Sequence, residues 1–281
     1  MQDLTLSPAD QVPLAALHDC FVEAFSDYLI GPFRLDLSQF SFFLRRQAVD
    51  LSLSRVACAG AEPLAFALVA PREQRWRVAG MGARPAARGS GAAPQLLDDF
   101  IARGLAARQQ ALELEVFAQN ERAVRLYQGR GFVARHELHG YEGTLDASQG
   151  MACILERPAL ADALRWLRQT AAARLQDLPL QVMPEVLAVA DTQTPLLSWR
   201  RGSAQLVFAL PDASSVQIHS LIDTDAAQRD AEALLRALAV QHAGRRLRVP
   251  QIQRLDIGGA ALRRLGFAPL PLHQLLMVRD A

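Results

Sequence analysis

The chain has 281 residues, of which 51% are hydrophobic and 21% charged, and its formal net charge is +1. This length suits two domains that each bury a core, and the even charge balance argues against a disordered chain and gives no support to a nucleic-acid partner. All 30 basic residues are arginine, which excludes Schiff-base chemistry and the lysine of nucleotide-hydrolase phosphate loops.

The three cysteines, Cys20, Cys58 and Cys153, are widely spaced, a pattern typical of a reducing compartment rather than of a disulfide scaffold. No two of them stand at metal-ligand spacing, so no metal is expected. The first ten residues contain no basic region before an apolar core, and no later stretch reaches the roughly 18 uncharged apolar residues of a membrane span. We therefore expect a cytoplasmic protein without a membrane partner.

The first 70 residues are predicted to form two helices followed by a β-hairpin. Apolar residues at steps of three and four predict a first helix over residues 14–28. A second, short helix is predicted over 38–47, with Ser38 as its cap. Segments 55–59 and 64–70 flank a turn-like tripeptide, and this arrangement predicts a β-hairpin.

The next elements alternate between strands and helices. A strand over 76–83 leads into a glycine-rich loop and a helix that includes 96–105. A strand over 112–116 and a short helix over 121–128 follow, and a glycine then turns the chain into another strand from Phe132.

The tail of the chain repeats this order. It has a strand over 216–222, a helix over 226–243 and a strand over 247–252. A short helix and the pair Gly266-Phe267 follow. Gly266-Phe267 follows Gly131-Phe132 by 135 positions (266 − 131), and the same offset carries Leu112 onto Leu247. We infer a divergent internal duplication and predict two domains, 1–150 and 151–281.

A glycine-rich loop, residues 88–93, lies between the predicted strand and the first turn of the helix that contains Pro94. Small residues allow a ligand to approach the backbone, and the amides with the helix dipole form an anion site that is worth roughly 0.3–2 kcal/mol to a bound charge. Alone, the loop fits a plain turn equally well.

The loop resembles the signature of the GNAT superfamily of N-acetyltransferases. That signature consists of Arg or Gln, any two residues, Gly, any one residue, and then Gly or Ala. Arg88, Gly91 and Ala93 occupy its three defined positions. The match extends downstream to Asn120, Ala123, Leu126, Tyr127, Gly131 and Phe132. A Rossmann dinucleotide site is the alternative, but a hairpin precedes this strand and no repeating βα pattern opens the chain. The resemblance implies an α/β (α+β) fold of two modules, each a mixed, mostly antiparallel twisted sheet flanked by helices.

The same resemblance implies a site for acetyl-CoA. The implied cofactor-binding residues are Met81, Gly82, Ala83, Arg88, Gly89, Ser90, Gly91, Ala92, Ala93 and Asn120. The strand of Met81 and Ala83 is expected to splay from that of Val116, so that the pantetheine arm bonds the backbone between them. Asn120 either contacts that arm or caps the following helix, and the two roles are compatible.

Tyr127 is the implied general acid, because the equivalent tyrosine of the family often lies beside the thioester sulfur; the alternative is a tyrosine that packs its helix on the sheet. The base stays open among Glu115, Asp27, His136, Glu137 and His139, or a water path. Asp27, in the segment where the family places substrate-covering helices, is a candidate to attract a cationic amine. The surrounding aromatic residues are expected to be core, and Arg75, Trp76 and Arg77 to be exposed strand residues.

In the second half, Asp223 and Asp225 occupy the positions where a pyrophosphate needs donors, and Leu262 replaces the tyrosine. We expect 151–281 to bind no acetyl-CoA and to shape the substrate cleft or a homodimer interface. The predicted function is transfer of an acetyl group from acetyl-CoA to a primary amine of a small molecule or peptide. The alternative is a non-catalytic sensor of CoA thioesters or a regulatory module.

Overall fold

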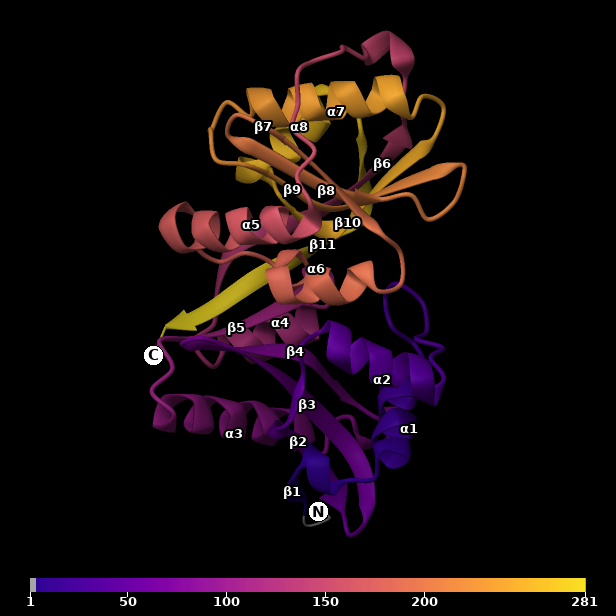
Figure 1. The fold of residues 1–281 in the computed structure, drawn as a ribbon. Coiled ribbons are helices and arrows are strands. Elements are labelled where there is room, and N and C mark those ends of the chain that lie inside the picture. The colour runs from indigo at the N-terminus through magenta and orange to yellow at the C-terminus, as the bar shows by residue number, and fades with distance from the viewer. Residues whose placement is uncertain (1–3, 281) are drawn as a thin grey trace. The chain divides into compact units, whose positions relative to one another are not determined.

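The computed structural model describes residues 4–280, without the side chains of residues 171 and 172. Its contacts divide the chain into two units (Figure 1). The first contains the chain up to Val116, Asn120–Val133 and the chain from Met277, and the second contains Phe117–Gln119 and Ala134–Leu276. Each unit is a mixed sheet flanked by helices, so the predicted fold class is confirmed.

The first unit is built on strands in the order β1-β2-β3-β4-β5, in which β4 and β5 are parallel and the other pairs antiparallel. The helices α1 and α2 lie on one face of this sheet and α3 on the other (Figure 1). The elements are β1 (Thr5–Pro8), α1 (Leu14–Ala24), α2 (Leu37–Arg46), β2 (Asp50–Ala59), β3 (Glu62–Arg72), β4 (Arg75–Ala83), α3 (Ala92–Ala106), β5 (Ala111–Phe117) and α4 (Glu121–Gln128).

The start of α2 differs from the prediction. Asp36, not Ser38, caps this helix, because the Asp36 carboxylate accepts the N–H of Gln39 at 2.8 Å. The Gln39 side chain in turn accepts the N–H of Asp36 at 2.9 Å, which completes a capping box. The expected cap at Ser38 is wrong because this reciprocal pair satisfies two free amides, whereas a lone serine satisfies one.

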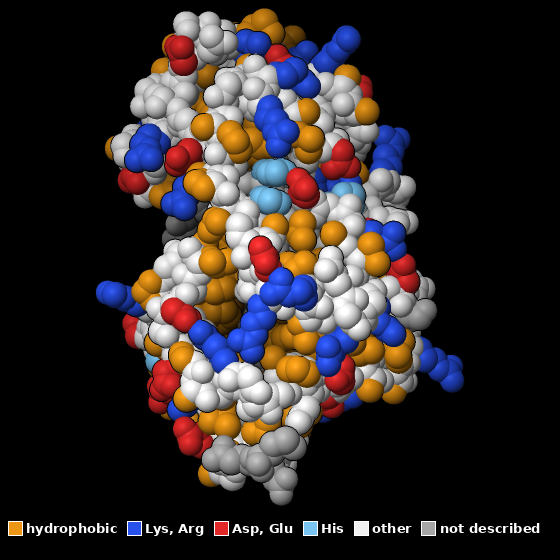
Figure 2. Space-filling model, turned by 180° about the vertical axis from the view of Figure 1, so that it is seen from behind, with side chains coloured by type: hydrophobic (Ala, Val, Ile, Leu, Met, Phe, Trp, Pro, Cys, Tyr) orange, Lys and Arg blue, Asp and Glu red, His pale blue; other side chains and the backbone are white. Residues whose placement is uncertain are grey.

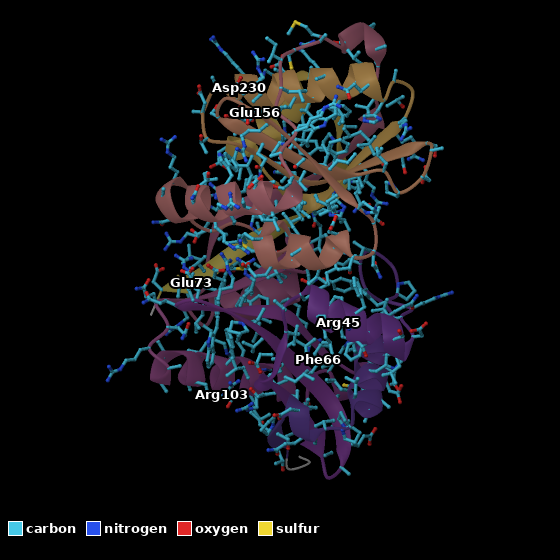
Figure 3. The ribbon with its side chains drawn as sticks, in the orientation of Figure 1. Arg45, Phe66, Glu73, Arg103, Glu156 and Asp230 are labelled. Carbon is cyan, nitrogen blue, oxygen red and sulfur yellow. The ribbon has the colours of Figure 1, made fainter. Side chains whose placement is uncertain are left out.

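Phe21 is the centre of an aromatic core between α1, α2 and β3. Its ring lies 4.9–5.7 Å from five other phenylalanine rings, those of Phe25, Phe33, Phe40, Phe43 and Phe66. Phe66 reaches this core from β3 (Figure 3). Phe21 and Phe40 are fully buried, as predicted, whereas Phe42 is partly exposed.

The second unit has strands in the order β11-β6-β10-β9-β8-β7, with β9 and β10 parallel. Helix α7 covers one face of its sheet, and α5 and α6 lie on the other (Figure 1). The elements are β6 (Val133–Thr144), α5 (Leu160–Arg174), α6 (Pro184–Asp191), β7 (Leu196–Arg201), β8 (Ala204–Ala209), β9 (Ser215–Asp223), α7 (Arg229–Gln241), β10 (Arg246–Arg254), α8 (Gly259–Arg264) and β11 (Ala268–Asp280).

The element order β2-β3-β4-α3-β5-α4-β6 recurs as β7-β8-β9-α7-β10-α8-β11. The turn before the last strand also recurs in detail. The N–H of Phe132 donates to the carbonyl of Tyr127 at 3.2 Å, and the N–H of Phe267 to that of Leu262 at 3.2 Å. The preceding glycines have φ of +83° and +80°, values that favour glycine.

The last strand of the first repeat belongs to the second unit. Strand β6 follows α4 in the chain but belongs to the second unit, where it pairs antiparallel with β10. The chain from Met277, at the end of β11, belongs to the first unit. A cut at residue 150 would therefore separate β6 from β10, the strand it pairs with, so measurements of binding and activity require the whole chain.

Replacing Phe21 with alanine removes the ring that the other five surround. We expect the free energy of unfolding of the first unit to fall by about 3–5 kcal/mol, the usual cost of deleting a buried phenylalanine. Urea denaturation followed by intrinsic fluorescence and circular dichroism measures it. The control is Phe42→Ala, which removes a partly exposed ring and should cost much less; equal losses in the two variants would contradict this picture of the core.

Candidate active site

Strands β4 and β5 pair over only part of their length. The parallel pairs run from Arg75 with Ala111 to Val78 with Leu114. Immediately afterwards β4 contains a bulge at Ala79, because its partner strand β3 pairs successive residues with Val78 and Gly80. Strand β4 continues along β3 to Ala83 and β5 continues to Phe117, but no pairing between them is found past Val78 in the described chain.

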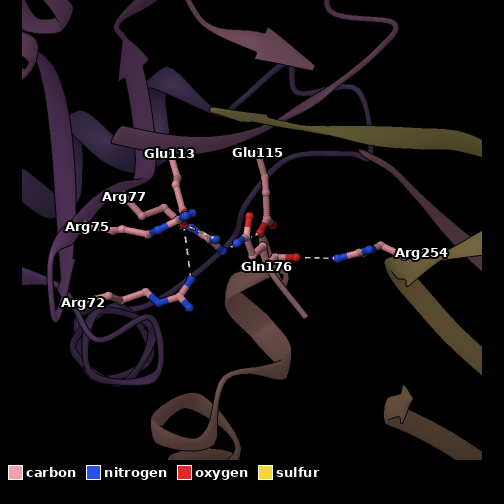
Figure 4. A network of polar contacts seen from close by, with 7 residues as sticks. All are labelled: Arg72, Arg75, Arg77, Glu113, Glu115, Gln176 and Arg254. Atoms are coloured by element: carbon pink, nitrogen blue, oxygen red, sulfur yellow. Dashed lines mark hydrogen bonds and ion pairs between the residues drawn. The ribbon is translucent and has the colours of Figure 1, made fainter. Parts of the chain in front are cut away.

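A buried ion-pair cluster fixes the two strands just before they separate (Figure 4). The Glu113 carboxylate is fully buried and accepts hydrogen bonds from Arg77 Nε at 3.0 Å, from Arg72 Nη1 at 3.2 Å and from Arg75. Arg77 also donates through Nη1 to Glu115 at 2.8 Å. Burial alone would raise the pKa of Glu113, but the charges of Arg77 and Arg72 and the hydrogen bonds lower it to about 2.

Two sequence predictions on these strands are wrong. Arg77 is 1% exposed and Trp76 is buried, although both were expected on an exposed strand. Trp76 packs on Phe100 of α3, with the Arg103 guanidinium 5.7 Å from its ring. Because neighbouring strand residues point to opposite faces, Arg77 is directed to the face that holds Glu113.

The loop between β4 and α3 presents unpaired main-chain donors. Gly89 and Gly91 have φ of +89° and +91°, so the loop needs glycine at both positions. A loop side chain makes one weak contact at the start of α3 in the described chain: Ser90 Oγ accepts the N–H of Ala92 at 3.3 Å. Within residues 4–280 the N–H groups of Gly89, Gly91 and Ala93 have no hydrogen-bond acceptor. Three donors at a helix start are therefore free to bind an anion.

The side chain of Arg88 is engaged by Asp27. The two guanidinium nitrogens Nη1 and Nη2 each lie 2.6 Å from a carboxylate oxygen of Asp27. Hydrogen bonding to Arg88 lowers the pKa of Asp27, which makes Asp27 a weaker base than a free carboxylate. Glu115, another candidate base, forms an ion pair with Arg77 Nη1 at 2.8 Å.

Tyr127 and Asn120 both lie on or next to α4. Tyr127 is 6% exposed, and burial, with a smaller contribution from Tyr28, raises the pKa of its phenol well above the ordinary value. The phenol therefore keeps its proton at neutral pH. Asn120 Oδ1 accepts the N–H of Ala123 at 3.2 Å, so Asn120 caps α4.

The remaining candidate bases belong to the other unit. His136, Glu137 and His139 lie on β6, in the second unit, whereas Tyr127 is in the first. His139 Nε2 lies 3.1 Å from Glu137, and its ring stacks on His273 with centroids 5.2 Å apart. In the sequence these three residues follow α4, and no local pattern indicates that their strand belongs to the second unit.

The second unit repeats the strand geometry but closes its helix start. Strand β9 has a bulge where Val207 pairs with Ser220 and Phe208 with Ile218, and β9 pairs with β10 only up to Gln217. The buried Asp223 carboxylate accepts the N–H groups of Asp225 and Ala231, each at 2.9 Å. The Asp225 carboxylate accepts the N–H of Ala227 at 2.8 Å. The chain's own carboxylates thus occupy the donors at the start of α7.

Comparison with known proteins identifies the family of the first unit. Residues 14–132 match the model of the acetyltransferase (GNAT) family. The chain carries a GNAT acetyltransferase domain. Residues 14–132 thus form an acyltransferase domain of the GNAT type. No curated protein matches the chain.

Solved structures with the same fold extend over the whole chain. The GCN5-related N-acetyltransferase from Anabaena variabilis has a TM-score of 0.69 at 16% identity, with 99% of this chain and 73% of that chain covered. The GCN5-related N-acetyltransferase from Sphaerobacter thermophilus has a TM-score of 0.61 at 15% identity, with 99% and 95% covered. At these identities the likeness establishes the GNAT fold of the chain.

Other kinds of site receive no support from the described residues. No helix in residues 4–280 is long and apolar enough to cross a membrane. No group of three or more His, Cys, Asp or Glu residues in this part of the chain is placed to hold a metal ion. Basic and acidic side chains are interspersed on the face drawn in Figure 2.

Replacing Glu113 with glutamine leaves three arginines without their shared counter-charge. At neutral pH we expect a loss of roughly 3–5 kcal/mol in the free energy of unfolding. Because the folded pKa lies near 2, below the ordinary 4.5, the carboxylate stabilises the fold above pH 4.5. This contribution is lost as the pH falls towards 2.

The difference between the wild type and Glu113→Gln should therefore shrink from pH 4.5 downwards, as measured by urea denaturation at a series of pH values. Glu121→Gln is the control, because the Glu121 side chain is 77% exposed and forms an exposed ion pair with Arg125. A difference that stays constant from pH 6 to pH 3 would show that Glu113 does not stabilise the fold as an ionised group.

Proposed function

We propose that the first unit transfers an acetyl group from acetyl-CoA to a primary amine of a small molecule or peptide. The observation that supports this most directly is the row of free N–H groups on Gly89, Gly91 and Ala93. They lie at the start of a helix, in a loop with the GNAT signature, where the diphosphate of acetyl-CoA would find both donors and the positive end of the helix dipole.

The cosubstrate would extend from this loop into the region where β4 and β5 no longer pair. The backbone of Met81, Gly82 and Ala83 follows the bulge on β4 and would bond the pantetheine arm. Asn120 would contact the same arm while its Oδ1 caps α4. The thioester would then lie beside the phenol of Tyr127.

In the reaction the amine nitrogen attacks the thioester carbon, the C–S bond breaks, and the thiolate takes a proton from Tyr127. An amine with an ordinary pKa of about 10.4 is about 3.4 units from its free base at pH 7, a cost near 4.6 kcal/mol. Some acceptor must therefore take the amine proton. Glu115 and Asp27 are each held in ion pairs, which favours a water path for this proton.

We propose that the second unit is a degenerate copy that binds no acetyl-CoA. Two facts support this: Asp223 and Asp225 occupy the donors at the start of α7, and Leu262 stands where Tyr127 stands in the first repeat. Calorimetric titration of the whole chain with CoA should give one site per chain; two sites of similar affinity would contradict this.

The test of the activity is a panel of small amines and peptides with acetyl-CoA, in which release of free thiol is followed. Turnover with at least one amine is expected. Tight CoA binding without turnover on any amine would instead favour a sensor of CoA thioesters or a regulatory module.

Gly91→Val places a branched side chain at a left-handed position in the loop. We expect CoA binding to weaken by about tenfold or more, since the loop must change conformation and its N–H groups turn away. Gly60→Val is the control: Gly60 also has positive φ, +60°, with no atom near its missing side chain, but lies in the β2–β3 turn. If both variants bind CoA equally well, the loop does not hold the cosubstrate.

Tyr127→Phe removes the proposed acid and keeps the ring. We expect kcat to fall by about 100-fold, at the lower end of the range for general acids, while the Kd for CoA stays the same. Tyr141→Phe is the matched control, because Tyr141 is also buried and its hydroxyl has no hydrogen-bond partner among the described residues. An unchanged kcat in Tyr127→Phe would assign Tyr127 to packing alone.

A further inference from the structure

The Arg88–Asp27 ion pair joins two regions with different expected tasks. Arg88 belongs to the signature loop and is the residue before Gly89, whose N–H is free. Asp27 lies three residues after the end of α1, in the segment expected to cover the acceptor. Both oxygens of Asp27 are bound at 2.6 Å, and Arg88 Nη2 also donates to the carbonyl of Ala24 at 3.2 Å. Both terminal nitrogens of Arg88 are thus turned towards α1.

This ion pair is placed to exchange partners. The side chains of Arg88 and Asp27 are 34% and 59% exposed, and ion pairs of this exposure contribute little to stability. A diphosphate bound at the N–H groups of Gly89 and Gly91 would lie next to Arg88 along the chain. It would offer a guanidinium two oxygens as Asp27 does, with more negative charge.

We infer that Asp27 is an internal anion that competes with the diphosphate of acyl-CoA for Arg88, so that cosubstrate binding frees the Asp27 carboxylate beside the acceptor. This rests on the proposed function of the same site. Asp27 is here a positioning residue, because it acts through Arg88.

The residue next to Asp27 connects this exchange to the reacting end of the site. The ring of Tyr28 packs on Phe25 and Phe33, at centroid distances of 4.9 and 5.8 Å. After burial, Tyr28 is a further cause of the raised pKa of Tyr127. A cationic amine would therefore meet a free Asp27 carboxylate only after acyl-CoA has taken Arg88, so acyl-CoA would bind before the amine.

The experiment measures the Kd of CoA for the wild type and for Asp27→Asn by calorimetry at low salt. Removing the competing anion should tighten CoA binding by roughly two- to fivefold, the range expected when an exposed ion pair need no longer be broken. Dephospho-CoA, which keeps the diphosphate, should show the same gain, and pantetheine, which lacks phosphates, should show none. In Arg88→Gln the further change Asp27→Asn should have no effect, because the two residues act through one contact.

Asp98→Asn is the matched control. Asp98 forms a two-point ion pair with Arg130 in the same unit, at 2.6 and 3.0 Å, and is also 59% exposed. The substitution Asp98→Asn removes one negative charge, as Asp27→Asn does, but does not release Arg88. The Kd of CoA should therefore change less than in Asp27→Asn. Wild-type binding of CoA with equal or weaker binding by Asp27→Asn overturns this inference and leaves the proposed function standing. No binding of CoA by the wild type overturns the proposed function itself.

Discussion

The buried carboxylate of Glu113 is the constraint on which the site depends. It draws arginines of β3 and β4 onto β5 and thereby holds the parallel pair Arg77–Glu113 in register. One residue pair later the pairing ends and β4 bulges at Ala79. Two strands can part within a sheet without fraying only if they are fixed up to that point. A charge cluster does this better than apolar contacts, because shifting the register would leave buried charges unpaired.

The bulge on β4 and the start of α3 both expose main-chain N–H donors. Past Ala79, β4 keeps its partner β3 on one side, so the chain up to Ala83 stays ordered where β5 no longer pairs with it. The loop that follows turns through two residues of positive φ, Gly89 and Gly91, and this leaves amides at the start of α3 unpaired. Backbone geometry leaves these donors open, and both arginines of the loop, Arg84 and Arg88, form ion pairs with carboxylates.

Sequence reasoning predicted the elements with strong periodicity and the signature loop, because these depend on local pattern. Helix α4 was predicted at its observed bounds, since Asn120 and Gly131 delimit it in the sequence. The burial of Arg77 was not predicted, because its partners lie on other strands and nothing local distinguishes a buried arginine from an exposed one. The place of β6 in the second unit likewise depends on which strand a segment pairs with, and a one-dimensional pattern does not contain that information.

The two repeats show how little separates a binding loop from a closed one. Both have the bulge, the parallel pair that ends early and a helix that starts after a residue of positive φ, Gly91 or Gln228. In the second repeat the Asp223 carboxylate accepts hydrogen bonds from main-chain N–H groups, and these groups are then not available to an external anion. A carboxylate of the same chain loses no translational or rotational entropy when it binds these donors. A free ligand does lose that entropy, so it would have to bind more strongly than the carboxylate to displace it. The same fold therefore leaves the donors at its helix start open or closes them, according to whether the chain itself supplies a carboxylate.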